Sequence, residues 1–151
     1  LREVLYHSAA QPGTSISTAC DYLAQVLRRR SIVFLVSDFF DSEYEQSLRT
    51  LARRHEVVAI TLVDPLDLEF PNVGVVEVED AEVGTRIFMD TSDRTFEKRY
   101  RHAAEKRTQR RRTALASADV DEIVIHLNDE LPEHGYLAPL ISYFRRRAEQ
   151  R

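Results

Sequence analysis

The chain has 151 residues and a formal net charge of −4, with 43% hydrophobic and 30% charged residues. This composition is typical of a soluble globular protein with one domain. No apolar run approaches the roughly 20 residues that cross a bilayer, and the first residues lack the apolar stretch of a signal peptide. The single cysteine, Cys20, excludes an internal disulfide and a cysteine-rich zinc site.

The charges are unevenly distributed along the chain. Residues 38–93 contain 14 acidic and 4 basic side chains, whereas residues 94–151 contain 13 basic and 9 acidic side chains. An acidic region beside a basic one can serve to bind a partner, but it is more often a pair of solvated faces.

The first element is predicted to be a helix that follows the turn at 11–15. Apolar residues recur at helical spacing up to about residue 27, and Thr14 or Ser15 can cap the helix. Cys20 lies on the apolar face of this helix and is expected to be buried.

Two apolar runs are predicted to form buried strands. Residues 31–37 do not alternate with polar residues, which is typical of a strand covered on both faces. A helix over about 43–54, opened by a capping box of Ser42 and Glu45, leads to the second run at 57–63.

The second half of the chain is predicted to contain a β-hairpin with one wet face, appended to the main sheet, and then further buried elements. In chain order these are strands at 73–79 and 85–89, a helix from Ser92 or Asp93 to about 117, a strand at 123–127 and a helix at 136–147. Successive strand–helix–strand units favour a right-handed parallel arrangement. The predicted fold class is therefore α/β, with a partial doubly wound, Rossmann-like and mainly parallel sheet and an inserted β-hairpin.

Asp38 and Thr14 are the candidate metal ligands. Asp38 follows the strand at 31–37, and ligands of parallel sheets collect at the carboxyl ends of strands. Thr14 opens a helix, so the pair offers hard oxygen atoms suited to Mg²⁺ or Mn²⁺. Two residues leave most of the six Mg²⁺ positions to water, and Asp38 could instead order the turn that follows it.

Three acidic residues support a second functional hypothesis. Asp38, Asp41 and Asp64 could gather along one sheet edge, as in metal-dependent phosphohydrolases and nucleases. The alternative is that they order turns and cap helices, with Asp64 in a turn before Pro65.

The remaining polar features favour structural roles. The basic run from Arg94 to Arg112 is interrupted by Glu97 and Glu105, so a solvated helix face is favoured over nucleic-acid binding. His126 and His134 have no accompanying nucleophile motif, and the four glycines lack the spacing of a phosphate-binding loop.

Four segments in this order resemble one family. They are the turn Pro12-Gly13-Thr14, the strand from Arg29 to Phe39 ending in Ser-Asp-Phe, the segment from Leu51 to Pro65, and the hairpin from Val76 to Gly84 with Asp90 and Thr91. Together they resemble the bacterial family called domain of unknown function 58, and the carboxyl-terminal half of a von Willebrand factor A-like domain. The resemblance covers nearly the whole chain.

The resemblance implies that residues 1–151 are a single domain, the carboxyl-terminal part of a longer von Willebrand A-like domain. Thr14 and Asp38 match the second and third parts of the metal-ion-dependent adhesion site. Its first part, Asp-x-Ser-x-Ser, does not occur in this chain. We therefore expect Mg²⁺ or Mn²⁺ in the full-length protein and no cofactor in this fragment.

The function implied by the resemblance is that of a non-enzymatic protein–protein interaction module that works with a MoxR-type AAA+ ATPase. The full-length protein would be cytoplasmic or membrane-associated, with membrane segments ahead of this fragment. In the von Willebrand A arrangement the strand at 31–37 pairs with a strand absent from this chain. We therefore expect an unpaired edge that favours a homodimer.

Overall fold

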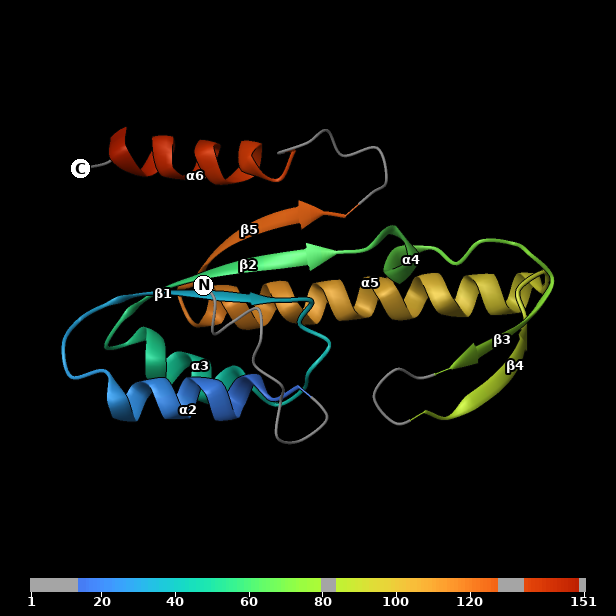
Figure 1. Cartoon of the computed structure of the whole chain (residues 1–151), viewed down its shortest axis with the longest axis horizontal. Helices are drawn as coiled ribbons and strands as arrows, with labels where there is room; N and C mark the ends of the chain where they lie inside the picture. The colour runs from blue at the N-terminus through green and yellow to red at the C-terminus, as the bar shows by residue number, and fades with distance from the viewer. Residues whose placement is uncertain (1–13, 80–83, 128–134, 150–151) are drawn as a thin grey trace.

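The computed structural model describes residues 14–79, 84–127 and 135–149, and its centre is a three-stranded parallel sheet (Figure 1). The strands are β1 (Ile32–Ser37), β2 (Glu56–Val63) and β5 (Asp121–His126), in the order β1-β2-β5. Phe34 lies opposite Val58, and Ile60 lies opposite Ile123. The predicted α/β class with a parallel sheet and a separate antiparallel hairpin is confirmed.

Helices cover the sheet from both sides (Figure 1). Side chains of α2 (Ile16–Val26), α3 (Glu45–Ala52) and α5 (Arg94–Ser117) pack on one face, and α6 (Leu137–Glu149) packs on the other. A single helical turn, α4 (Pro65–Leu68), follows β2 at the carboxyl end of the sheet. None of the described helices has the length and apolar character needed to cross a membrane.

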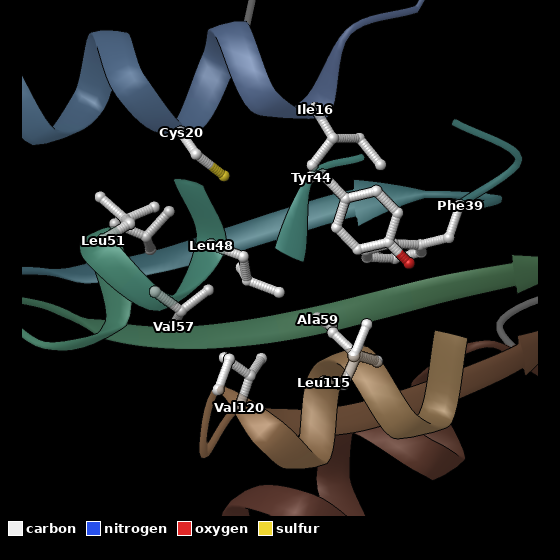
Figure 2. Packing of buried hydrophobic residues seen from close by; sticks show 13 residues of the cluster. Ile16, Cys20, Phe39, Tyr44, Leu48, Leu51, Val57, Ala59, Leu115 and Val120 are labelled. Atoms are coloured by element: carbon white, nitrogen blue, oxygen red, sulfur yellow. The ribbon is translucent and has the colours of Figure 1, made fainter. Parts of the chain in front are cut away.

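The larger core lies between the sheet and α2, α3 and α5. Figure 2 shows Cys20 of α2, Leu48 and Leu51 of α3 and Val57 of β2 packed around a common centre. Successive residues of a strand point to opposite faces, so Val57 belongs to this core while Val58 packs against α6. As expected, Cys20 is fully buried, and burial, aided by the charge of Asp21, raises the pKa of its thiol to about 11.

The prediction that β1 is covered on both faces is wrong. Val33 is buried and Leu35 half-buried against the larger core, whereas Ile32, Phe34 and Val36 are each about half exposed. The reason is that β1 is an edge strand of the described sheet and α6 covers mainly β2 and β5. An unbroken apolar run therefore does not require two covered faces.

Two predicted helix starts differ from the structure. Helix α3 begins after Tyr44, which makes no side-chain capping bond, so the expected Ser42–Glu45 capping box does not form. Instead, the Glu45 carboxylate pairs with Arg110 of α5 at 3.3 Å. At the start of α2, the expected cap is confirmed, because the Ser15 hydroxyl accepts the N–H of Thr18.

The hairpin forms a two-stranded sheet of its own and is not hydrogen-bonded to the main sheet, in contrast to the prediction. Its strands are β3 (Val75–Glu79) and β4 (Arg86–Asp90). Val75 and Phe88 are 69% and 75% exposed, so apolar side chains lie at the surface of the hairpin. Buried Thr91 holds its base, since its hydroxyl donates to the Gly74 carbonyl and accepts the N–H of Val73.

Truncating Leu48 tests the larger core. Because this side chain is fully buried, Leu48→Ala is expected to lower the free energy of unfolding by roughly 2–5 kcal/mol. Leu66→Ala is the matched control, since Leu66 is 51% exposed, and should change it by about 0.5 kcal/mol or less. Urea denaturation measures both variants, and equal effects would contradict the packing described here.

Candidate functional site

The loop after β1 turns sharply at Phe39. Asp38 is exposed, and its carboxylate accepts the N–H of Phe40 at 3.1 Å and the hydroxyl of Ser37 at 3.4 Å. Phe39 has φ +60°, a left-handed conformation that is unusual for a bulky residue. Its ring is buried against Tyr44, 5.7 Å between centroids, so packing compensates for the backbone strain. The turn leaves Asp38 and Phe40 at the surface on either side of it.

Asp41 joins the loop after β1 to the start of α2. One carboxylate oxygen accepts the N–H of Ile16 at 2.6 Å, and the other accepts the N–H of Ser42. These bonds satisfy a backbone group of the first helical turn and place negative charge where the helix dipole favours it. The Asp41 carboxylate therefore binds backbone N–H groups, which matches the alternative that it orders turns and caps a helix.

Thr14 lies exposed immediately before the N-cap Ser15 of α2. The Asp41–Ile16 bond brings the start of α2 to the loop that contains Asp38. Among the described residues, however, no hydrogen bond joins Thr14 to Asp38. The pairing of these two residues at a metal site stays a prediction.

Asp64 and Asp67 form a capping box at the end of β2. The Asp64 carboxylate accepts the N–H of Leu66 at 2.8 Å, and the Asp67 carboxylate accepts the N–H of Asp64 at 3.2 Å. The segment Asp64-Pro65 thus opens a short helix, where a simple turn was predicted. A helix of one turn is too short for apolar periodicity to reveal it.

The pKa of Asp67 is raised above its usual value. Burial is the main cause, and the negative charges of Asp64 and Asp38 add to it. The hydrogen bond from Asp64 and the positive charge of Arg107 act in the opposite direction. Asp38, which follows β1, and Asp64, which follows β2, therefore both lie close enough to Asp67 to affect its ionisation.

Arg107 and Tyr100 of α5 connect this helix to α4 through hydrogen bonds. The Arg107 guanidinium donates to the Asp67 carbonyl at 3.0 Å and lies over the Phe40 ring, 5.1 Å from its centroid. The Tyr100 hydroxyl donates to the Leu66 carbonyl at 2.6 Å. Sequence reasoning assigned Arg107 to a solvated face, because only the fold shows which cations of α5 meet the sheet edge.

A small cavity of about 20 Å³ lies among Asp38, Phe40, Asp67 and Arg107. Binding pockets for small molecules usually measure several hundred Å³, so this cavity does not accommodate a typical substrate. A wider groove of about 580 Å³ lies between α3 and α5. Hydrogen bonds from Arg49 to Ser117 and from Arg110 to Glu45 link the two helices across this groove.

The residues described here do not fit a complete metal centre. In residues 14–79, 84–127 and 135–149, no group of three or more His, Cys, Asp or Glu side chains could hold a metal ion. Asp41 and Asp64 are committed to backbone N–H groups, and Thr14 with Asp38 would supply at most two of the six oxygen ligands that Mg²⁺ prefers.

The exposed part of this region is an apolar surface bordered by carboxylates. Phe40 is 52%, Leu66 51% and Leu68 39% exposed. We call this surface the acidic edge, defined as Asp38, Phe40, Asp64, Leu66, Asp67 and Leu68.

A largely buried ion pair lies beside the acidic edge, since its arginine, Arg111, lines the same small cavity, and the sequence did not reveal it. Arg111 of α5 pairs with Glu122 of β5 at 2.7 Å, and the Thr61 hydroxyl of β2 donates to the same Glu122 oxygen at 2.8 Å. The side chains of Arg111 and Glu122 are 10% and 17% exposed. The network joins α5 to the two strands β2 and β5.

The other predicted residues lie elsewhere. His126 is exposed at the end of β5, and His134 lies outside the described residues, as do Pro12 and Gly13. In the basic run of α5, Arg101 pairs with Glu97 and Glu69 on the surface. These contacts leave the nucleic-acid hypothesis untested.

The pH dependence of stability tests the environment of Asp67. A raised folded-state pKa means that ionised Asp67 costs stability, and this cost is relieved as the pH falls through that pKa. Asp67→Asn keeps an oxygen for the Asp64 N–H, so it is expected to raise the urea midpoint at pH 7. The difference should shrink below about pH 4.

Asp90 provides a control, because its pKa is shifted in the direction opposite to that of Asp67. Hydrogen bonds from Ser92 lower its pKa, so its carboxylate contributes stability at neutral pH that is lost on acidification. Asp90→Asn should therefore lower the urea midpoint slightly at pH 7 and not in acid. A midpoint for Asp67→Asn below that of the wild type at pH 7 would refute the assignment.

A double-mutant cycle tests the buried ion pair. Arg111→Met leaves Glu122 without its cation in a largely buried position, which is expected to cost roughly 3–5 kcal/mol of unfolding free energy. In the double variant Arg111→Met with Glu122→Met most of this loss should be recovered. Additive losses in urea denaturation would show that the two side chains are not coupled.

The comparisons with known proteins place the chain in a family. The family model described as "Protein of unknown function DUF58" matches residues 1–112. An uncharacterised protein of Mycobacterium avium is 43% identical over 75 residues, which cover 48% of this chain and 44% of that protein. An uncharacterised protein of Mycobacterium tuberculosis is 43% identical over 70 residues, which cover 46% of this chain and 22% of that protein.

The matched segment thus spans less than half the length of these relatives. No solved structure matches the chain. The family match covers most of the residues, including β1, the acidic edge and α5 up to Arg112. The chain belongs to the DUF58 family of proteins of unknown function.

Proposed function

We propose that the chain is a protein-interaction module without catalytic activity, and that it binds its partner at the acidic edge. The observation that carries this proposal is the exposure of Phe40, Leu66 and Leu68 beside three carboxylates. Exposed apolar side chains with a polar rim are typical of protein-binding surfaces.

The roles of the carboxylates support binding over catalysis. Asp41, Asp64 and Asp67 each accept backbone N–H groups, so they shape the loop and α4. The neighbouring cavity of about 20 Å³ leaves little room for a phosphoester. A metal-dependent phosphohydrolase that uses Asp38, Asp41 and Asp64 is therefore less well supported.

The partner that fits is a segment with basic and apolar side chains. Lysine or arginine would pair with Asp38 and Asp67, and apolar side chains would cover Phe40 and Leu66. This contact needs no metal ion. Given the resemblance to the von Willebrand A-like domains of this family, we propose a MoxR-type AAA+ ATPase as the protein that carries this segment.

Titration with a MoxR-type AAA+ ATPase from the same organism tests the proposal. Phe40→Lys and Leu66→Lys remove apolar contact and repel a basic segment, so each should weaken binding at least about tenfold in calorimetry. Glu77→Lys on the hairpin, outside the acidic edge, is the control and should bind like the wild type.

Two results would contradict the proposed function. The first is equal binding by the wild type and both acidic-edge variants, or no binding by any of them. The second is turnover of a generic phosphoester with Mg²⁺ or Mn²⁺ that disappears in Asp38→Asn, which would favour the phosphohydrolase alternative.

A further inference from the structure

The hairpin of β3 and β4 projects from the body of the described structure. Its two strands form a sheet of their own, and a two-stranded hairpin in water is only marginally stable without further packing. In Figure 1 the hairpin extends from the amino-terminal end of α5, on the same side of that helix as α3. A contact that covers the hairpin would therefore stabilise it.

One face of the hairpin carries an exposed aromatic ring among carboxylates. Phe88 is 75% exposed, the highest value among the large apolar side chains of the described residues, and it lies opposite Glu77 in the antiparallel pair. Opposed residues share a face, and the face alternates along each strand. We call this surface the hairpin face, defined as Val75, Glu77, Glu79, Arg86, Phe88 and Asp90. Arg86 pairs with Glu79 at 2.9 Å and with Glu77 at 4.0 Å, so the face has three carboxylates and one cation.

The groove between α3 and α5 has complementary properties. Its volume of about 580 Å³ lies within the range of roughly 300–1,000 Å³ that is typical of binding pockets, so an aromatic ring fits into it. It is lined by three cations, Arg49, Lys106 and Arg110, and by two carboxylates, Glu45 and Glu105.

Two of the three groove cations have no carboxylate partner in the described part of the chain. Arg110 pairs with Glu45 at 3.3 Å. Arg49 instead donates to the uncharged hydroxyl of Ser117 at 3.0 Å, and Lys106 forms no ion pair with a described residue. The groove therefore has an excess of positive charge, whereas the hairpin face has an excess of negative charge.

Both halves of this match occur in one chain, which favours a second copy as the occupant of the groove. The chain is acidic over residues 38–93, with 14 acidic and 4 basic side chains, and basic over residues 94–151, with 13 basic and 9 acidic side chains. None of the described hairpin residues lines the groove of its own chain. The groove residues of α5 begin at His102, about 12 Å along the helix from its first residue, Arg94, beside the base of the hairpin.

The positions of the two surfaces allow a symmetric contact. The hairpin lies near the amino-terminal end of α5, and α3 lies near its carboxyl-terminal end, where Arg49 bonds to Ser117 (Figure 1). When two copies meet with their α5 helices antiparallel, each hairpin lies opposite α3 of the other copy. A two-fold axis then forms the same contact twice and closes the assembly at two copies.

We propose that the chain forms a two-fold dimer in which the hairpin face of each copy docks in the α3–α5 groove of the other. Phe88 enters the groove, where its ring is removed from water. Glu77 and Asp90 supply negative charge to Arg49 and Lys106 of the other copy. The dimer thus covers the ring that a single copy exposes and balances charge on both surfaces.

This inference goes beyond the proposed function and does not rest on it. No residue of the acidic edge belongs to the hairpin face or lines the groove. Glu77→Lys, the control of the partner titration, should therefore weaken the dimer and leave the affinity for the ATPase unchanged. The two contacts can thus fail separately.

Sedimentation velocity over a range of concentrations tests the dimer. The wild-type chain should show a monomer–dimer equilibrium. Phe88→Ser removes the ring and Lys106→Glu reverses a groove cation, so each should weaken dimerisation at least about tenfold. In an equimolar mixture of these two variants, one intact hairpin still meets one intact groove. The mixture should therefore associate more strongly than either variant alone.

Ile87→Ser and Arg112→Glu are the matched controls. Ile87 is 51% exposed on the opposite face of the hairpin, and Arg112 is an exposed cation of α5 that does not line the groove. Both variants should dimerise like the wild type. A wild type that stays monomeric at high concentration, a mixture that associates no more strongly than its components, or controls as weak as Phe88→Ser would overturn the proposal.

Discussion

Strand β2 is the centre on which the rest of the described structure depends. It is paired on both sides, with β1 through Ile32–Glu56 to Ser37–Thr61 and with β5 through Val58–Asp121 to Val63–His126. Its odd and even residues supply the two cores, so α2, α3 and α5 are held on one face and α6 on the other. Among the described residues, the same arrangement gives β1 one strand partner, β2.

Carboxylates in this protein act mainly on the backbone. Asp41, Asp64, Asp67 and Asp93 each accept N–H groups at the start of a helix. The first three lie where the strands end, so negative charge collects at the carboxyl end of the sheet. Arg107 balances part of this charge from α5, and its stacking on Phe40 keeps an apolar ring at the surface. Much of the negative charge at the acidic edge thus comes from Asp64 and Asp67, which cap α4.

Much of the fold could be predicted because long helices and strands show a regular spacing of apolar residues in the sequence. The strands β1, β2 and β5, the helices α2 and α5 and the burial of Cys20 all follow from spacing and composition. The family resemblance, based on four ordered segments, is confirmed for DUF58. Asp38 and Asp64 could be placed at strand ends because each is the first charged residue after an apolar run.

The remaining features depend on tertiary contacts that a sequence does not display. Arg111 looks like one more cation in a basic run until Glu122 is found beside it. The apolar run of β1 is the same whether one face is covered or two, so its exposed row could not be predicted from composition. Asp67, Phe40 and Arg107 come from a single helical turn, a loop and a long helix, and the fold alone brings them together.

Amide hydrogen exchange along β1 tests its parallel pairing with β2 most directly. The account predicts slow exchange at Val33 and Leu35, whose N–H groups point toward β2, and faster exchange at Ile32, Phe34 and Val36, whose N–H groups point away from it. Faster exchange at Val33 and Leu35 than at the other three residues would contradict the register described here.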